Sequence, residues 1–188
     1  SPDNIIQIAS MTKLVTTIAA LQLVEQGKLD LDTPISAYAP ELNELQVLKG
    51  FEADDTPSFE KANRAPTARE LMTHTAGYVY EFWNANALKG GQLGVTPSLF
   101  GEGNYLAAPL AFQPGTAWEY GINTDWLGVL VERLSGHSPA DYFDDNTITP
   151  LVMTHTFYVA HPAKPDRPVT VMTRAAQRPV ELRGFRAT

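Results

Sequence analysis

The sequence contains no cysteine among its 188 residues. Disulfide bridges, thiolate metal sites and a cysteine nucleophile are therefore excluded. No stretch approaches the roughly 18 consecutive apolar residues that a membrane-spanning helix needs, so we expect no membrane span. The N-terminal "SPDNII" has no basic region followed by an apolar core. We see no signal peptide in it and favour a cytoplasmic location.

Positive charge is also scarce. The chain has 14 Lys and Arg against 21 Asp and Glu, a formal net charge of −7 at pH 7, which argues against a nucleic-acid partner. The charge is unevenly spread: residues 1–161 hold 8 basic and 19 acidic residues, whereas residues 162–188 hold 6 and 2. We therefore divide the chain into a main domain, 1–161, and an atypical basic tail, 162–188.

Two segments carry apolar residues at helical spacing. One is residues 125–134, which end before Gly136. The other is residues 11–26. Ala19, Ala20 and Leu23 make this segment apolar on more than one side, which predicts a central helix. Its apolar positions three and four apart predict one buried face, made by Leu14, Val15, Ile18, Leu21 and Val24.

Shorter signals divide the rest of the main domain. Residues 75–117 contain seven glycines, which is typical of long irregular connections. The other predicted elements are a short helix after Pro34, a strand within 44–51, a surface loop over 52–66, a capping box at Thr67–Glu70, a helix begun by Ser138 and Pro139, and a strand over 155–160.

Ser10 and Lys13 are the first candidates for chemistry. Residues three apart on a helix lie on one face with Cβ atoms about 5–6 Å apart, so a lysine amine can reach the serine hydroxyl. A serine near a helix N-terminus also places its backbone N–H where an oxyanion would form. A lysine acts as a base only when neutral. Apolar neighbours would lower its pKa: Ile6, Ile8, Met11, Leu14 and Val15.

Other candidates are weaker. Tyr120 precedes a helix and is either a packing aromatic or a group that relays the serine proton to a leaving group. Ser138 in "GHSPA" approximates a nucleophile elbow, but no strand precedes it and the final glycine is missing. His74 is expected to form a local hydrogen bond. The four histidines show no recognised metal-ligand spacing, and we expect neither a metal nor an organic cofactor.

Four segments in order resemble the serine β-lactamase and penicillin-binding-protein superfamily, above all class C β-lactamases and family VIII carboxylesterases. They are "IASMTKLVTTIAALQLVEQGKLDLDTPI", "PTARELMTHTAGY", "FQPGTAWEYGINTDWLGVLVERLSGHS" and "ITPLVMTHTFY". The resemblance implies an α+β, β-lactamase/transpeptidase-like fold. We expect the chain to contain mostly the helical region of that fold, with much of the antiparallel sheet missing.

The resemblance also implies roles. Ser10 would be the acylated nucleophile, Lys13 its activating partner and Tyr120 the second proton-transfer group, giving hydrolysis through an acyl-enzyme. Trp118 and Asn123 flank Tyr120 and are the candidate substrate-binding residues. Class C β-lactamases usually show Tyr-x-Asn, whereas this chain reads "YGIN". That departure favours a small ester substrate over a lactam.

One motif of the superfamily is missing. It is often Lys-Thr-Gly, on a strand that supplies an oxyanion N–H, and nothing after residue 160 resembles it. Three hypotheses about the function therefore remain: an esterase that cleaves short acyl esters, a β-lactamase or D-alanyl-D-alanine peptidase-like hydrolase, and a truncated, catalytically silent member of the family. An apolar catalytic helix without its sheet further predicts self-association that covers it.

Overall fold

A computed structural model describes residues 5–99, 101, 103–158, 171–172 and 179–180. Five α-helices lie in this part: α1 (Thr12–Glu25), α2 (Ala68–Met72), α3 (Ala85–Gln92), α4 (Asn123–Ser135) and α5 (Pro139–Phe143). The strands are β1 (Gln46–Phe51), β2 (Pro57–Lys61), β3 (Val171–Met172) and β4 (Pro179–Val180). Short 3₁₀ turns span Ala9–Met11, Ile35–Ala37, Pro40–Glu44 and Tyr105–Ala107, and a π-helical turn spans Asp144–Ile148.

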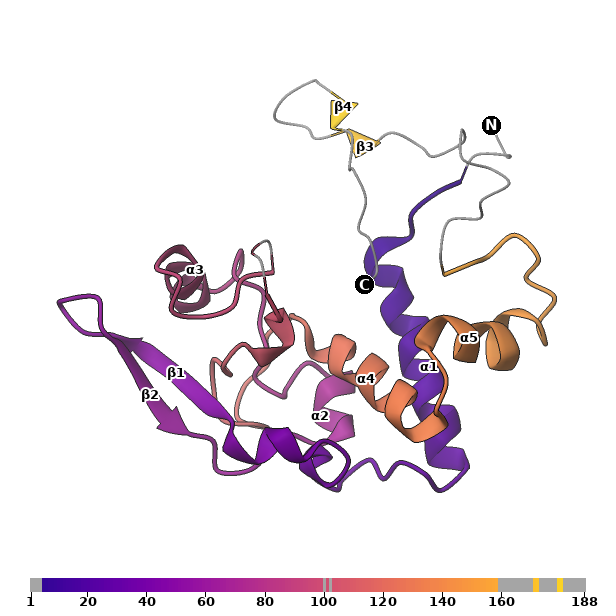
Figure 1. The fold of residues 1–188 in the computed structure, drawn as a ribbon, viewed down its shortest axis with the longest axis horizontal. Helices are drawn as coiled ribbons and strands as arrows, with labels where there is room; N and C mark the ends of the chain where they lie inside the picture. The colour runs from indigo at the N-terminus through magenta and orange to yellow at the C-terminus, as the bar shows by residue number, and fades with distance from the viewer. Residues whose placement is uncertain (1–4, 100, 102, 159–170, 173–178, 181–188) are drawn as a thin grey trace.

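Helix α4 is the centre of the core. It packs against α1, α2 and α5 (Figure 1) and fully buries Leu127, Leu130 and Val131. Burial of side chains of this size is the main stabilising contribution to such a core. The helix ends at Gly136, whose φ of +76° is the left-handed conformation that glycine adopts without steric cost. Both main predicted helices are present, with boundaries shifted by one or two residues.

The buried face of α1 differs from the prediction. Its buried residues are Thr16, Ala19, Ala20 and Leu23. Leu14 is 68% exposed, and Ile18 and Leu21 are also exposed. Small residues face α4 because they let two helix backbones approach closely, while the large aliphatic side chains form an apolar outer face. Self-association through that outer face stays a prediction.

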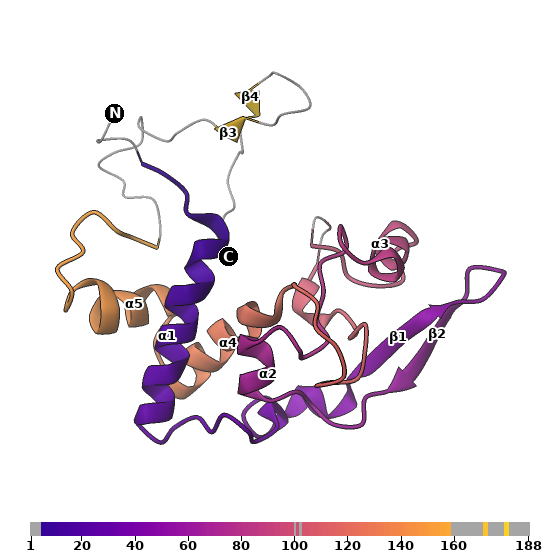
Figure 2. The ribbon, with the colours of Figure 1, turned by 180° about the vertical axis from the view of Figure 1, so that it is seen from behind.

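A β-hairpin forms the other end of the molecule. β1 and β2 pair antiparallel from Gln46 opposite Lys61 to Phe51 opposite Pro57 (Figure 1), and the hairpin lies away from α1 in the reverse view as well (Figure 2). β1 was predicted, whereas β2 lies inside the predicted surface loop. Leu110 runs parallel to β1, exchanging backbone hydrogen bonds with Gln46 and Leu48.

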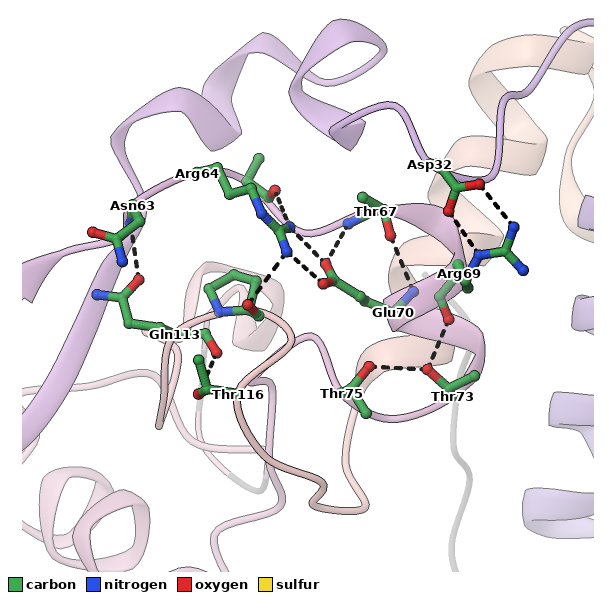
Figure 3. A network of polar contacts seen from close by, with 12 residues as sticks. Asp32, Asn63, Arg64, Thr67, Arg69, Glu70, Thr73, Thr75, Gln113 and Thr116 are labelled. Atoms are coloured by element: carbon green, nitrogen blue, oxygen red, sulfur yellow. Dashed lines mark hydrogen bonds and ion pairs between the residues drawn. The ribbon is translucent and has the colours of Figure 1, made fainter.

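A polar network fixes the segment before α2 against the Pro114–Gly115 turn (Figure 3). The Glu70 carboxylate accepts hydrogen bonds from Arg64 at 2.6 and 2.7 Å and from the Thr67 N–H at 2.9 Å. Arg64 also donates to the Pro114 carbonyl at 3.3 Å. The Thr67–Glu70 capping box predicted from sequence is present. The network matters for the site because this turn leads directly into Trp118 and Tyr120.

Two further predictions can be compared with the described residues. The Ser138 hydroxyl accepts from the Asp141 N–H at 3.1 Å and caps α5, as expected. Residues 155–158 form no strand, and residues 159 and 160 lie outside the described residues. Of the tail, the structure describes β3 and β4 alone, so the division at residue 161 stays a prediction. No helix in the described part is long and apolar enough to cross a membrane.

Candidate active site

Ser10 lies in the 3₁₀ turn that leads into α1 and is exposed. The residue before it, Ala9, has φ +46°, a left-handed conformation that costs a non-glycine residue roughly 1–2 kcal/mol. Backbone strain of this kind persists where the surrounding structure imposes it, and it clusters at functional sites. The turn therefore presents the Ser10 hydroxyl at the N-terminal end of a central helix.

Lys13 connects Ser10 to a second chain segment. Its ammonium donates to Ser10 Oγ at 3.2 Å and to the hydroxyl of Tyr80 at 3.1 Å. The same nitrogen lies 5.0 Å from the ring centroid of Tyr120 and 5.5 Å from that of Tyr80. The structure thus brings together the three residues that the resemblance singled out, and it adds a fourth.

Tyr120 is placed by a close backbone approach. At the next residue, Gly121, a Cβ atom would lie 2.4 Å from the Tyr78 carbonyl oxygen and from the Val79 Cα, so a larger residue cannot fit without a shift. Burial alone would raise the pKa of Tyr120, but hydrogen bonding with Ser10 and Lys13 and the charge of Lys13 outweigh it and lower that pKa. The phenol therefore ionises more readily than a free tyrosine.

The pKa of Lys13 differs from our expectation. Burial would lower it, but hydrogen bonds with Tyr80 and Tyr120 and their electrostatic interaction raise it above its ordinary value. The expected apolar surroundings are largely absent, because Ile6, Met11 and Leu14 are exposed. Lys13 is therefore an ammonium near neutral pH and cannot itself accept the Ser10 proton, whereas Tyr120 can accept it once its phenol has ionised.

Tyr80 is the residue that sequence reasoning missed. It lies 67 positions from Lys13, in the glycine-rich stretch between α2 and α4 where no periodicity guides a prediction. Its ring stacks on Phe82 at 4.9 Å and lies 5.6 Å from the ring of Tyr120. Burial raises the pKa of Tyr80, so its hydroxyl stays protonated while it accepts from Lys13.

Asn123, one of the two candidate substrate-binding residues, lies in the interior of the protein. It is fully buried, and its amide nitrogen donates to the Tyr78 carbonyl at 2.8 Å and lies 3.0 Å from His74 Nδ1. Because the side chain is fully buried here, the expected contact of Asn123 with substrate stays a prediction that this structure does not support directly. Trp118 is 65% exposed, so its substrate-binding role stays a proposal.

Asp125 is a half-buried carboxylate near these groups. Tyr105 donates to Asp125 Oδ1 at 2.9 Å, and burial raises the pKa of Asp125 while Lys13 and Tyr105 oppose that rise. The carboxylate in turn raises the pKa of Tyr80 and of Tyr120, each as a minor contribution. Among the described residues, no group of three His, Asp or Glu side chains gathers that could hold a metal ion.

A serine hydrogen-bonded to a lysine at the start of α1, with a tyrosine of lowered pKa beside both, is the arrangement expected from the resemblance to the β-lactamase/transpeptidase-like fold. The family model described as Beta-lactamase matches residues 1–187. The chain belongs to this family, within the serine β-lactamase and penicillin-binding-protein superfamily.

Several relatives act on esters or transfer acyl groups. The chain is 40% identical over 162 residues to "Lovastatin esterase" of Penicillium rubens, covering 83% of this chain and 40% of that protein. It is 38% identical over 183 residues to "Acyltransferase calJ" of Penicillium decumbens, covering 94% and 43%. The unliganded structure of "Simvastatin Synthase (LovD)" from Aspergillus terreus matches with a TM-score of 0.79 at 34% identity, covering 92% and 45%. The chain thus spans less than half the length of these relatives.

Proposed function

We propose that the chain carries the acyl-enzyme chemistry of an esterase, with Ser10 as nucleophile and a small ester as substrate. The observation that carries the proposal is the Lys13 ammonium bonded to Ser10 Oγ at 3.2 Å beside a tyrosine whose pKa is lowered. A nucleophilic hydroxyl needs an adjacent base, and Tyr120 in its ionised form, beside the Lys13 ammonium, would be that base.

The first step transfers one proton and forms one bond. Ser10 Oγ attacks the ester carbonyl carbon while its proton passes to the oxygen of Tyr120, which must be ionised to accept it and whose lowered pKa favours that form. Lys13 remains an ammonium, because its hydrogen bonds with Tyr80 and Tyr120 raise its pKa, and it stabilises the phenolate. The tetrahedral intermediate then expels the alcohol, which takes the proton from Tyr120, and the acyl group stays on Ser10.

The second step returns the enzyme to its starting state. Water attacks the acyl carbon and gives its proton to Tyr120, and that proton returns to Ser10 as the ester bond to the enzyme breaks. This releases the acid. Groups of this type typically contribute about 10²–10⁴-fold to a rate, so loss of Tyr120 should be severe without abolishing all reaction.

Acyl transfer is a second candidate function. It differs from hydrolysis only in the acceptor, because an alcohol replaces water in the second step and a new ester is released. The name "Acyltransferase calJ" supports this candidate, whereas the name "Lovastatin esterase" supports hydrolysis. The exposed Trp118 would offer an apolar surface to such an acceptor. A β-lactamase or peptidase-like activity, or a chain without turnover, are the remaining alternatives.

Turnover assays on one sample separate these candidates. The wild-type chain and Ser10→Ala are offered a short-chain p-nitrophenyl ester, with and without an added alcohol, and a chromogenic cephalosporin. Ester turnover lost in Ser10→Ala supports the esterase, and a new ester formed from the alcohol supports the transferase. Comparable cephalosporin turnover favours the lactamase, and no turnover of any probe favours the silent chain. Ser138→Ala is the matched control and should leave all rates unchanged.

A further inference from the structure

His74 occupies the space beside the candidate proton acceptor. Its ring lies 4.6 Å from that of Tyr120 at an interplanar angle of 45°, and 6.4 Å from that of Trp118 in an edge-on contact. The backbone joins the same two segments, because the Glu119 N–H donates to the His74 carbonyl at 3.0 Å. His74 therefore contacts the Tyr120 segment through both its side chain and its main chain.

The buried amide of Asn123 fixes which imidazole nitrogen carries the proton. The atom 2.8 Å from the Tyr78 carbonyl must be the NH₂ group, because a carbonyl oxygen there would face another acceptor. The same NH₂ lies 3.0 Å from His74 Nδ1. It can donate there only if Nδ1 is unprotonated, so the neutral ring carries its hydrogen on Nε2.

The charges around His74 also favour the neutral ring. Burial lowers its pKa, and the ammonium of Lys13 on α1 lowers it further. The other ionisable group packed against it is the phenol of Tyr120, while the Glu119 carboxylate accepts from Asn84 at 3.2 Å. A protonated ring would place a second positive charge near Lys13 and would lose its capacity to accept from Asn123.

The backbone at His74 adopts a conformation that is unfavourable for a histidine. Its φ is +58°, in the left-handed region where a glycine would be unstrained and a histidine costs on the order of 1 kcal/mol or more. A glycine would suit this backbone better. A histidine therefore occupies a strained backbone position, which is the pattern expected where a side chain has a role in a functional site.

We propose that His74 is a positioning residue: its neutral imidazole, held in the Nε2–H tautomer by Asn123, keeps the Tyr120 phenol directed at Ser10 and Lys13. The proposal deepens the acyl-enzyme chemistry and rests on it for the role of Tyr120. It also gives Asn123 a role other than the expected substrate contact, since the amide acts on the proton acceptor through His74.

The first test reads the tautomer directly and needs no turnover. Long-range ¹H–¹⁵N correlation on ¹⁵N-labelled chain, with His74 assigned by its loss in His74→Asn, should show an unprotonated Nδ1 and a protonated Nε2 at pH 7.5. The opposite tautomer, or a charged ring at that pH, overturns the proposal. If Ser10 is never acylated, the esterase proposal fails, but this measurement still decides the state of His74.

The second test separates positioning from folding. His74→Gly relieves the backbone strain, so its melting temperature should stay within a few degrees of wild type. The Tyr120 ionisation, read by ultraviolet titration against Tyr120→Phe, should move up toward the ordinary tyrosine value. Labelling of Ser10 by a fluorophosphonate should slow roughly tenfold to a hundredfold, less than loss of a whole proton-transfer group.

The matched control is Asp55→Gly. Asp55 also has a positive φ, +67°, but lies at the hairpin tip in an ion pair with Lys89. Its glycine variant should label at the wild-type rate. If His74→Gly labels at the wild-type rate with an unchanged Tyr120 titration, His74 does not position Tyr120. If His74→Asn restores part of the rate that His74→Gly loses, the side chain and not the strain is responsible.

Discussion

The Lys13 ammonium lies 3.1 Å from the hydroxyl of Tyr80, a residue 67 positions further along the chain. This hydrogen bond joins α1 to the irregular segment between α2 and α4, and it is one of the interactions that raise the pKa of Lys13. The cation at the site is therefore held by a residue outside the motifs that identify the family.

Tyr80→Phe tests that contact. Removing a hydrogen bond to a charged group costs about 1.5–3 kcal/mol, so we expect fluorophosphonate labelling of Ser10 at pH 7 to slow roughly tenfold or more. The pKa of Lys13 should fall, and the alkaline limb of the labelling profile should move to lower pH. Tyr38→Phe is the control, because the Tyr38 hydroxyl accepts a hydrogen bond from the Asp30 N–H. Ser10 in this variant should be labelled at the wild-type rate. A profile in Tyr80→Phe identical to wild type would contradict this account.

Two glycine variants test the backbone approach that places Tyr120. Gly121→Ala puts a methyl group against the Tyr78–Val79 backbone, and overpacking of this kind typically destabilises by about 1–3 kcal/mol. Gly128→Ala on α4 meets nothing within 4 Å, so it should be neutral or stabilise by about 0.5–1 kcal/mol. Urea unfolding measures both free energies. Equal stability of the two variants would show that the close approach is not limiting.

The contribution of Glu70 to the free energy of unfolding should depend on pH. Burial would raise the pKa of Glu70, but hydrogen bonds from Arg64 and Thr67 outweigh it and lower that pKa below 4.5. A carboxyl with a lowered folded-state pKa stabilises the fold above its unfolded pKa and loses that contribution as the pH falls through the folded value. We expect Glu70→Gln to cost about 1–2 kcal/mol at pH 7 and progressively less below pH 4.5.

The Glu70 measurement is urea unfolding at a series of pH values. Glu44→Gln is the matched control, because Glu44 forms an exposed ion pair with Lys61 at 3.0 Å, and exposed pairs contribute little. A Glu70→Gln penalty that does not shrink in acid would mean that the lost stability comes from packing and not from the charged pair.

His74 predicts a second pH window for stability. Its folded-state pKa lies below the ordinary 6.5, so the unfolded chain binds a proton more readily than the folded one. Stability should therefore decline as the pH falls below 6.5, and His74→Asn should remove that part of the decline. His137→Asn, at an exposed histidine after α4, controls for the loss of a histidine. An unchanged decline in His74→Asn would contradict a half-buried, neutral ring.

The helices and their caps could be read from sequence because local chemistry specifies them. Ser138 caps α5 and Thr67 caps α2 through hydrogen bonds within three residues, and the apolar spacing of α4 matches its buried face. The face of α1 could not be read in this way. Its aliphatic side chains follow helical spacing, but the close packing against α4 selects the small residues Ala19 and Ala20.

Long-range partners escaped prediction for the same reason. Tyr80 carries no local pattern, and only the fold brings its hydroxyl to Lys13. β2 was missed because Pro57 and the polar residues of this stretch suggest a loop. Our prediction that the pKa of Lys13 is lowered was wrong for the same reason. Apolar residues close in sequence, such as Leu14, lie on the exposed face of α1 and do not enclose the ammonium. Two tyrosines distant in sequence contact it instead and raise its pKa.

The most direct measurement of the central claim is intact-protein and peptide mass spectrometry after reaction with a fluorophosphonate or a slowly hydrolysed ester. We predict a single adduct on the peptide that contains Ser10, which is absent in Ser10→Ala and forms much more slowly in Tyr120→Phe. An unmodified wild-type chain, or an adduct on Ser138 that persists in Ser10→Ala, would contradict it.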